Sequence, residues 1–168
     1  MIQNLLVPMR PSKLWKDLPP ETRVSAAEAF WREEEAGEQQ AEAIVLLARR
    51  LNFRTKSVQG LPVERRARHL AQLPDVSDAI AGRALVAYHF AHERPLMTAF
   101  LDALGIAHEN GLITADEVPA PAPEALAAAV KKTRAEFPPE AVDLYLRTLL
   151  VLDGDTWSGL DPMLAPTH

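Results

Sequence analysis

Three of the five histidines lie in one short part of the chain, and their spacing is the first feature that could do chemistry. His89 and His92 are three residues apart, so on a helix they share one face and can bind the same metal ion. Imidazole and carboxylate ligands suit zinc or iron, and an open coordination position would permit hydrolytic or oxidative chemistry. The fold would have to supply a third ligand, and the candidates are Glu93, Asp102, His108 and Glu109.

The local sequence does not match the common metal-site patterns. In HFAHE the glutamate follows both histidines, unlike in HExxH or HxxEH. Di-metal four-helix bundles need Glu-x-x-His, and no glutamate stands three residues before a histidine anywhere in the chain. The alternative is that His89 and His92 lie at a helix interface and form hydrogen bonds with carbonyls or carboxylates. The sequence favours this structural interpretation.

The neighbouring pair His108 and Glu109 could act as acid and base on a loop, where functional residues concentrate. The same residues also open the turn HENG, in which Asn110-Gly111 supplies positive φ angles. No nucleophile motif, dinucleotide fingerprint or Gly-rich phosphate loop occurs, and the chain has no cysteine. The sequence therefore identifies no catalytic residue and leaves open whether the protein is an enzyme.

A third candidate site is a basic segment between residues 49 and 68, which holds six arginines and one lysine against Glu64 alone. The residues that could bind phosphate or nucleic acid are Arg54, Lys56, Arg65, Arg66 and Arg68. Phe53 is its single aromatic residue, so base stacking would be poor. The alternative is an exposed face paired with the acidic helix around residues 33–38. The net charge of −5 favours this alternative and argues against nucleic acid as a partner.

The bulk composition is that of an ordinary globular protein, with 48% hydrophobic and 24% charged residues in 168. No stretch reaches the roughly 20 apolar residues that span a bilayer, and the N-terminus does not read as a secretory signal. We therefore expect a cytoplasmic protein that does not enter membranes.

Helical periodicity dominates and predicts an all-α fold. We expect about seven helices around a central helix over residues 76–93, capped by Asp75. A Schellman closure should follow at Gly105 and Ile106, and a small two-stranded ribbon should join residues 106–107 to 112–113. Thr114 to Glu117 reads as a capping box for one short helical turn. Residues 52–60 read as irregular.

Prolines divide the chain into three expected parts. We expect residues 1–20 to form an irregular N-terminal arm, because prolines interrupt any helix there. Its large apolar residues would cover the helical bundle or a second subunit. Residues 21–118 form the main helical bundle. The proline-rich stretch 118–123 then leads to a C-terminal helical hairpin and tail over residues 119–168, with Gly154 as the stop of the second helix.

The leading functional hypothesis is a non-enzymatic helical protein that acts through protein contacts and associates with itself. The alternative is a metal-binding protein or metal-dependent enzyme that uses His89, His92 and a ligand from the His108–Glu109 loop, with zinc or iron as cofactor. Phosphate or nucleic-acid binding through the basic segment ranks third.

Overall fold

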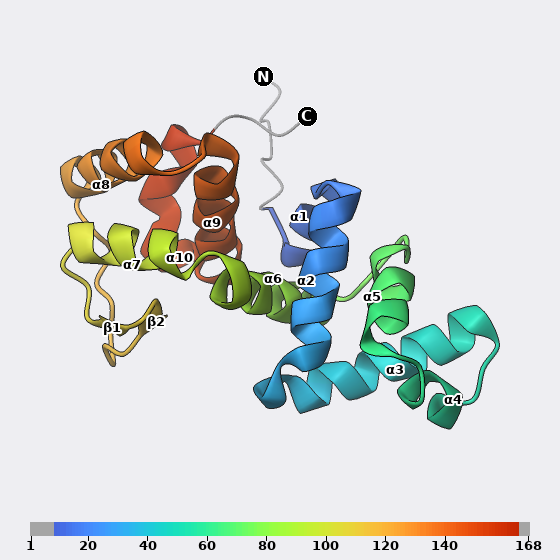
Figure 1. Cartoon of the computed structure of the whole chain (residues 1–168). Helices are drawn as coiled ribbons and strands as arrows, with labels where there is room; N and C mark the ends of the chain where they lie inside the picture. The colour runs from blue at the N-terminus through green and yellow to red at the C-terminus, as the bar shows by residue number, and fades with distance from the viewer. Residues whose placement is uncertain (1–8, 165–168) are drawn as a thin grey trace, which may run out of the picture.

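The computed structural model describes residues 9–164, and residues 1–8 and 165–168 lie outside the described part. The all-α prediction is confirmed, because this part of the chain consists of helices and one two-stranded ribbon (Figure 1). The elements are α1 (Pro11–Asp17), α2 (Pro20–Arg32), η1 (Glu34–Ala36), α3 (Gly37–Leu51), α4 (Thr55–Gln59), α5 (Val63–Ala71), α6 (Asp78–His92), α7 (Arg94–Ala103), β1 (His108–Glu109), β2 (Leu112–Ile113), α8 (Pro123–Glu136), α9 (Pro139–Leu152), α10 (Gly154–Trp157) and η2 (Ser158–Met163).

Helix α6 is the central element, as the sequence predicted. It packs against α1, α2, α3, α7 and α9. It begins later than expected, because Ser77 rather than Asp75 caps it: the Ser77 hydroxyl accepts the Ile80 N–H at 3.2 Å. A serine hydroxyl at this position satisfies one of the backbone donors that a helix leaves free at its start. Asp75 is exposed, three residues before α6.

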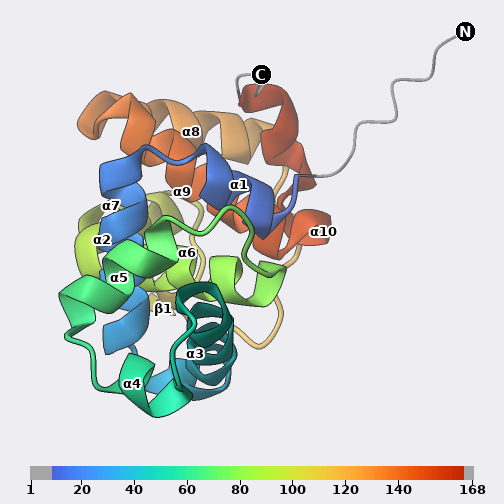
Figure 2. The same cartoon turned by 90° about the vertical axis from the view of Figure 1, so that its right-hand side faces the viewer.

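The buried side chains form two hydrophobic clusters. In the ribbon, α6 lies between α1–α5 and the group α7–α10 (Figures 1 and 2). The first cluster lies among α1–α6 and the second among α7–α10. Because α7 contributes Leu96 and Phe100 to the second cluster, the core divides between α6 and α7 rather than at the proline-rich stretch. The domain boundary predicted at residues 118–119 stays a prediction, but the packing groups α7 with the C-terminal hairpin.

The expectation of an irregular N-terminal arm is wrong for residues 11–17, which form α1. Pro11 lies in the first turn of α1, where a backbone N–H would have no partner within the helix, so proline loses no hydrogen bond. Pro20 lies in the first turn of α2 in the same way. Leu14, Trp15 and Leu18 are buried in the same chain's first cluster. Residues 1–8 of the predicted arm, with Leu5, Leu6 and Val7, lie outside the described residues.

Two further local predictions are wrong, and a third holds with an addition. Residues 52–60 include the short helix α4, which Arg54 precedes in extended conformation. Thr114 to Glu117 form no helical turn. The second helix of the hairpin, α9, ends at Leu152, two residues before the predicted stop at Gly154. Gly154 also begins α10, because the Asp153 carboxylate accepts the Thr156 N–H at 3.3 Å and so caps a new turn.

The Schellman closure after α7 is confirmed. Gly105 has φ 67°, the Ile106 N–H donates to the Leu101 carbonyl at 3.0 Å, and the Gly105 N–H donates to that of Asp102 at 3.0 Å. The two-stranded ribbon is also present, but its first strand is His108–Glu109 instead of residues 106–107. His108 pairs with Ile113, so Asn110 and Gly111 are the two turn residues.

Alanine at Gly111 is expected to destabilise the protein more than alanine at Gly105. Both glycines have positive φ, which costs an L-residue about 1–2 kcal/mol. A Cβ at Gly111 would also lie 3.2 Å from Met97 Cβ, whereas nothing lies within 4 Å of one at Gly105. Urea denaturation of both variants gives the comparison, and equal losses would show that Met97 does not restrict this turn.

Along residues 9–164, no helix combines the length and the apolar character that crossing a membrane requires.

Candidate functional site

His89 is buried where the two hydrophobic clusters meet. Its side chain is 2% exposed, and its ring lies 5.5 Å from the Tyr145 ring of α9 and 5.3 Å from that of Tyr88. Nδ1 lies 2.8 Å from the Leu85 carbonyl, so it carries the proton and donates it. Nε2 has no hydrogen-bond partner among the described residues. Burial lowers the pKa of His89 to about 4, and the bond to Leu85 offsets this only in part.

His92 is exposed, although it lies one turn from His89 on the same helix. Its ring lies against that of Tyr88, with centroids 5.2 Å apart. It lines a hollow of about 480 Å³ between the end of α2 and the start of α7. Four glutamates and two arginines also line this hollow: Glu28, Glu33, Glu34, Glu35, Arg32 and Arg94. Partial burial raises the pKa of Glu93, and His92 lowers it to a smaller extent.

His108 connects the ribbon to the end of α7. Its Nε2 lies 2.6 Å from Asp102 Oδ1, and its Nδ1 accepts the Gly111 N–H at 3.1 Å. Because Nδ1 is an acceptor, the neutral ring carries its proton on Nε2 and donates it to Asp102. This pair holds the turn against α7. Glu109, the other predicted loop ligand, is exposed on β1.

The predicted metal ligands therefore do not converge. His89 points into the core, His92 lines the acidic hollow, and His108 binds Asp102 at the far end of α7. Within residues 9–164, no group of three or more histidine, aspartate or glutamate side chains is placed to hold a metal ion.

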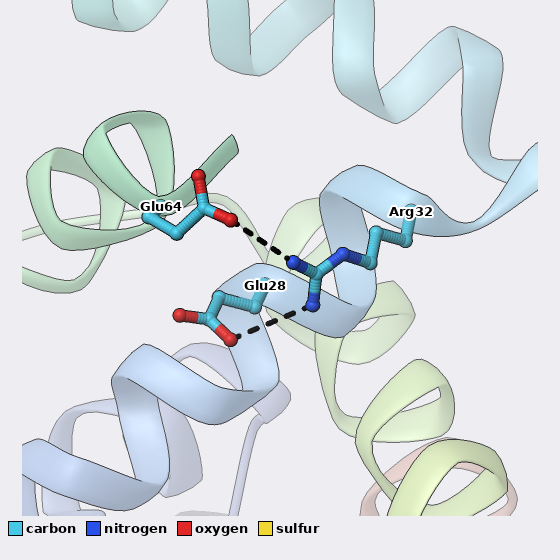
Figure 3. Close-up of polar contacts among 3 residues, drawn as sticks. All are labelled: Glu28, Arg32 and Glu64. Carbon is cyan, nitrogen blue, oxygen red and sulfur yellow. Dashed lines mark hydrogen bonds and ion pairs between the residues drawn. The ribbon is translucent and has the colours of Figure 1, made fainter. Parts of the chain in front are cut away.

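The acidic segment, residues 28–42, and the basic segment, residues 49–68, meet at one ion pair among the described residues, and its polarity is the reverse of the expected one (Figure 3). Arg32, the arginine of the acidic segment, lies 3.3 Å from Glu64 of α5 and 3.6 Å from Glu28. Glu64 is in turn the single acid of the basic segment. Among the described residues, no glutamate of the acidic segment forms an ion pair with a cation of the basic segment. The acidic and basic segments therefore do not neutralise each other through the ion pairs that the sequence led us to expect.

The five predicted phosphate-binding residues do not form one site. Arg54 and Lys56 are exposed at α4, and Arg65 is exposed on α5. The Arg66 guanidinium lies 4.9 Å above the centre of the Trp31 ring, a cation–π contact that has a structural role. Arg68 lines a pocket together with residues of α1 and α2.

The pocket at Arg68 holds two cations that sequence reasoning missed, Lys16 of α1 and Arg23 of α2. Lys16 was hidden in the segment expected to be irregular, and Arg23 stands between Thr22 and Val24, outside the basic segment. No pattern in the sequence links residues 16, 23 and 68, because only the packing of three helices brings them together.

Helix α3 presents a second surface feature. Glu42, Val45, Leu46 and Arg49 share one face and line a hollow of about 560 Å³ beside the segment that joins α5 to α6. Val45 is 45% exposed, while Ala43 and Leu47 on the opposite face are buried. Helix α3 lies at the lower end of the molecule in both views (Figures 1 and 2).

Comparisons of this chain with models of protein families, with curated proteins and with solved structures find no match.

Proposed function

We propose that the protein is a non-enzymatic helical protein that acts through protein contacts and associates with itself through the exposed face of α3. One observation supports this: along that face the order is acid, apolar, apolar, base, at Glu42, Val45, Leu46 and Arg49. Such an order is self-complementary under a two-fold rotation, which is the commonest symmetry of soluble oligomers.

The pairing follows from helix geometry. Glu42 and Arg49 stand seven residues apart, or two turns, which is about 10 Å along the axis. They are therefore too distant to pair with each other. In two antiparallel copies related by an axis between Val45 and Leu46, Glu42 lies opposite Arg49 of the partner subunit. The reciprocal pair forms at the other end of the contact.

The charges on this face lack ion-pair partners in the described part of the chain. Neither Glu42 nor Arg49 forms an ion pair among the described residues. Glu38 stands four residues before Glu42, a like-charge spacing that mildly destabilises an isolated helix. A cation from a second copy would remove this repulsion. The acidic start and the basic end of α3 are about 22 Å apart. A second, antiparallel copy can therefore place an opposite charge beside each end.

The apolar residues at the centre of the α3 face set the expected affinity of the dimer. Val45 is 45% exposed and Phe53, just after the helix, is 47% exposed. One helix face buries less than the roughly 1,200–2,000 Å² of a stable interface. We therefore expect a weak, salt-sensitive dimer. The lack of cysteine suits a reducing compartment, so we also propose a cytoplasmic location. The metal alternative has no such supporting observation, because its ligands do not converge.

Reversing either charge is expected to weaken the dimer about tenfold or more, because like charges then face each other twice across the two-fold axis. The variants are Glu42→Arg and Arg49→Glu, and sedimentation velocity over a concentration series gives the dissociation constant. An equimolar mixture of the two variants is expected to form a heterodimer. In that heterodimer both charge contacts across the two-fold axis again join opposite charges.

Two controls make this test specific. Arg65→Glu reverses an exposed charge on α5 that lies off this face and is expected to leave the dimer intact. Circular dichroism verifies that each variant folds. A wild-type protein that stays monomeric at every concentration would refute self-association. A dimer that neither reversal affects would refute the α3 contact.

A further inference from the structure

Three cations from three helices line one pocket of about 350 Å³: Lys16 of α1, Arg23 of α2 and Arg68 of α5. No aspartate or glutamate lines it. None of the three cations forms an ion pair with a carboxylate in the described part of the chain. Arg23 Nε is buried and has no hydrogen-bond partner within residues 9–164. In a chain of net charge −5, this is an uncompensated concentration of positive charge.

The helix ends at the pocket do not cancel that charge. Pro20, at the start of α2, and Ala71, at the end of α5, both line it. A helix start carries roughly half a positive charge and a helix end roughly half a negative charge. These two contributions oppose each other, so the three side chains determine the field in the pocket.

The uncharged residues that line the pocket indicate what the rest of a ligand would be. Val24, Ala71, Leu73 and two prolines supply apolar surface, and Gln72 adds an amide. A volume of about 350 Å³ lies at the small end of ligand pockets, which span about 300–1,000 Å³. This space exceeds what a bare inorganic anion needs. It accommodates an anionic group on a small organic body.

We propose that this pocket, which we call the Arg68 pocket, binds the phosphate group of a small phosphate monoester. The planar guanidinium groups of Arg23 and Arg68 suit two phosphate oxygens each, and Lys16 adds a compact point charge. The apolar walls contact the organic part of the ester. The Arg68 pocket shares no lining residue with the hollow on α3, so this proposal does not rest on self-association.

Calorimetric titration with phenyl phosphate tests the proposal, with inorganic phosphate as the probe that lacks an organic body. We expect saturable binding of both, with phenyl phosphate the tighter. Arg68→Gln and Lys16→Gln are each expected to weaken phenyl phosphate binding about tenfold, because a charge-assisted contact is lost. Both positions are exposed, so these variants keep the fold, as circular dichroism can verify.

Arg65→Gln is the matched control, since it makes the same change in charge at an exposed position of the same helix outside the pocket. It is expected to leave binding unchanged at constant salt. Co-sedimentation with vesicles containing phosphatidic acid distinguishes the source of the phosphate ester: pelleting that Arg68→Gln abolishes assigns the site to a lipid headgroup. The absence of saturable binding would overturn the proposal, and so would equal losses in Arg65→Gln and Arg68→Gln.

Discussion

Replacing Trp15 by alanine is expected to lower the free energy of unfolding by about 3–5 kcal/mol, the usual loss when a large aromatic side chain leaves a packed core. Trp15 is 2% exposed and belongs to the first hydrophobic cluster. Helix α1, which carries it, packs against both α6 and α9. The substitution therefore opens a cavity where the first helix joins the central one.

The indole nitrogen moderates this loss. Trp15 Nε1 is buried and has no hydrogen-bond partner among the described residues, which costs stability in the folded protein. Trp15→Phe removes this unpaired donor and keeps most of the apolar ring. It is therefore expected to cost much less than alanine. Lys16→Ala, at an exposed neighbour, is expected to change stability by less than about 0.5 kcal/mol.

Urea denaturation followed by circular dichroism measures all three variants. If Trp15→Ala were no more destabilising than Lys16→Ala, the packing of α1 on α6 would be refuted. The expected loss also bears on any study of self-association. Deleting residues 1–18 removes Leu14, Trp15 and Leu18 from the core, so a change in oligomeric state after that deletion would report unfolding.

The long helices could be predicted because each carries its own evidence. α5 has Pro62 before it, a clear apolar face and Pro74 after it, and the structure places it over Val63–Ala71. α7 ends at a glycine that only a left-handed conformation explains, and Gly105 adopts it. In these segments local preference and tertiary packing agree.

The short helices could not be predicted, because their residues do not repeat often enough to show a period. α1 has seven residues and α4 has five, less than two turns each. Pro11 reads as an interruption in the sequence, yet it lies in the first turn of α1, where proline is favoured. The capping box at Thr114 fails for the opposite reason: its pattern is present, but no helix follows.

The candidate sites were harder still, since they depend on residues distant in sequence. Lys16, Arg23 and Arg68 meet because α2 packs on both α5 and the body around α6. The structural interpretation of His89 agrees with its buried position and its hydrogen bond to Leu85. The sequence could not reveal that His89 and His92, one turn apart, would lie in the core and at the surface respectively.

The stability of the protein is expected to fall by about 3 kcal/mol through His89 alone as the pH decreases from 6.5 to about 4. Burial lowers the pKa of His89 to about 4 in the folded protein, from the ordinary value of 6.5. Between these values the unfolded chain binds a proton that the folded chain excludes. The contribution of His89 to the free energy of unfolding is therefore fully present above pH 6.5 and is lost progressively toward pH 4.

The geometry explains why the folded protein excludes this proton. Nδ1 already donates to the Leu85 carbonyl, so a second proton would have to sit on Nε2. That atom is buried and faces no acceptor among the described residues. The nearest rings are those of Tyr88 and Tyr145, and burial raises the pKa of both, so neither changes charge in this acidic range.

Urea denaturation at a series of pH values from 4 to 8 tests this expectation against two variants. His89→Leu removes the titrating group, so its stability should depend on pH less steeply than that of the wild type between 6.5 and 4. His92→Leu, at an exposed position on the same helix, should keep the wild-type slope. If His89→Leu and the wild type lost stability in parallel, the excluded proton would not be on His89. The acid sensitivity would then belong to other groups of the fold.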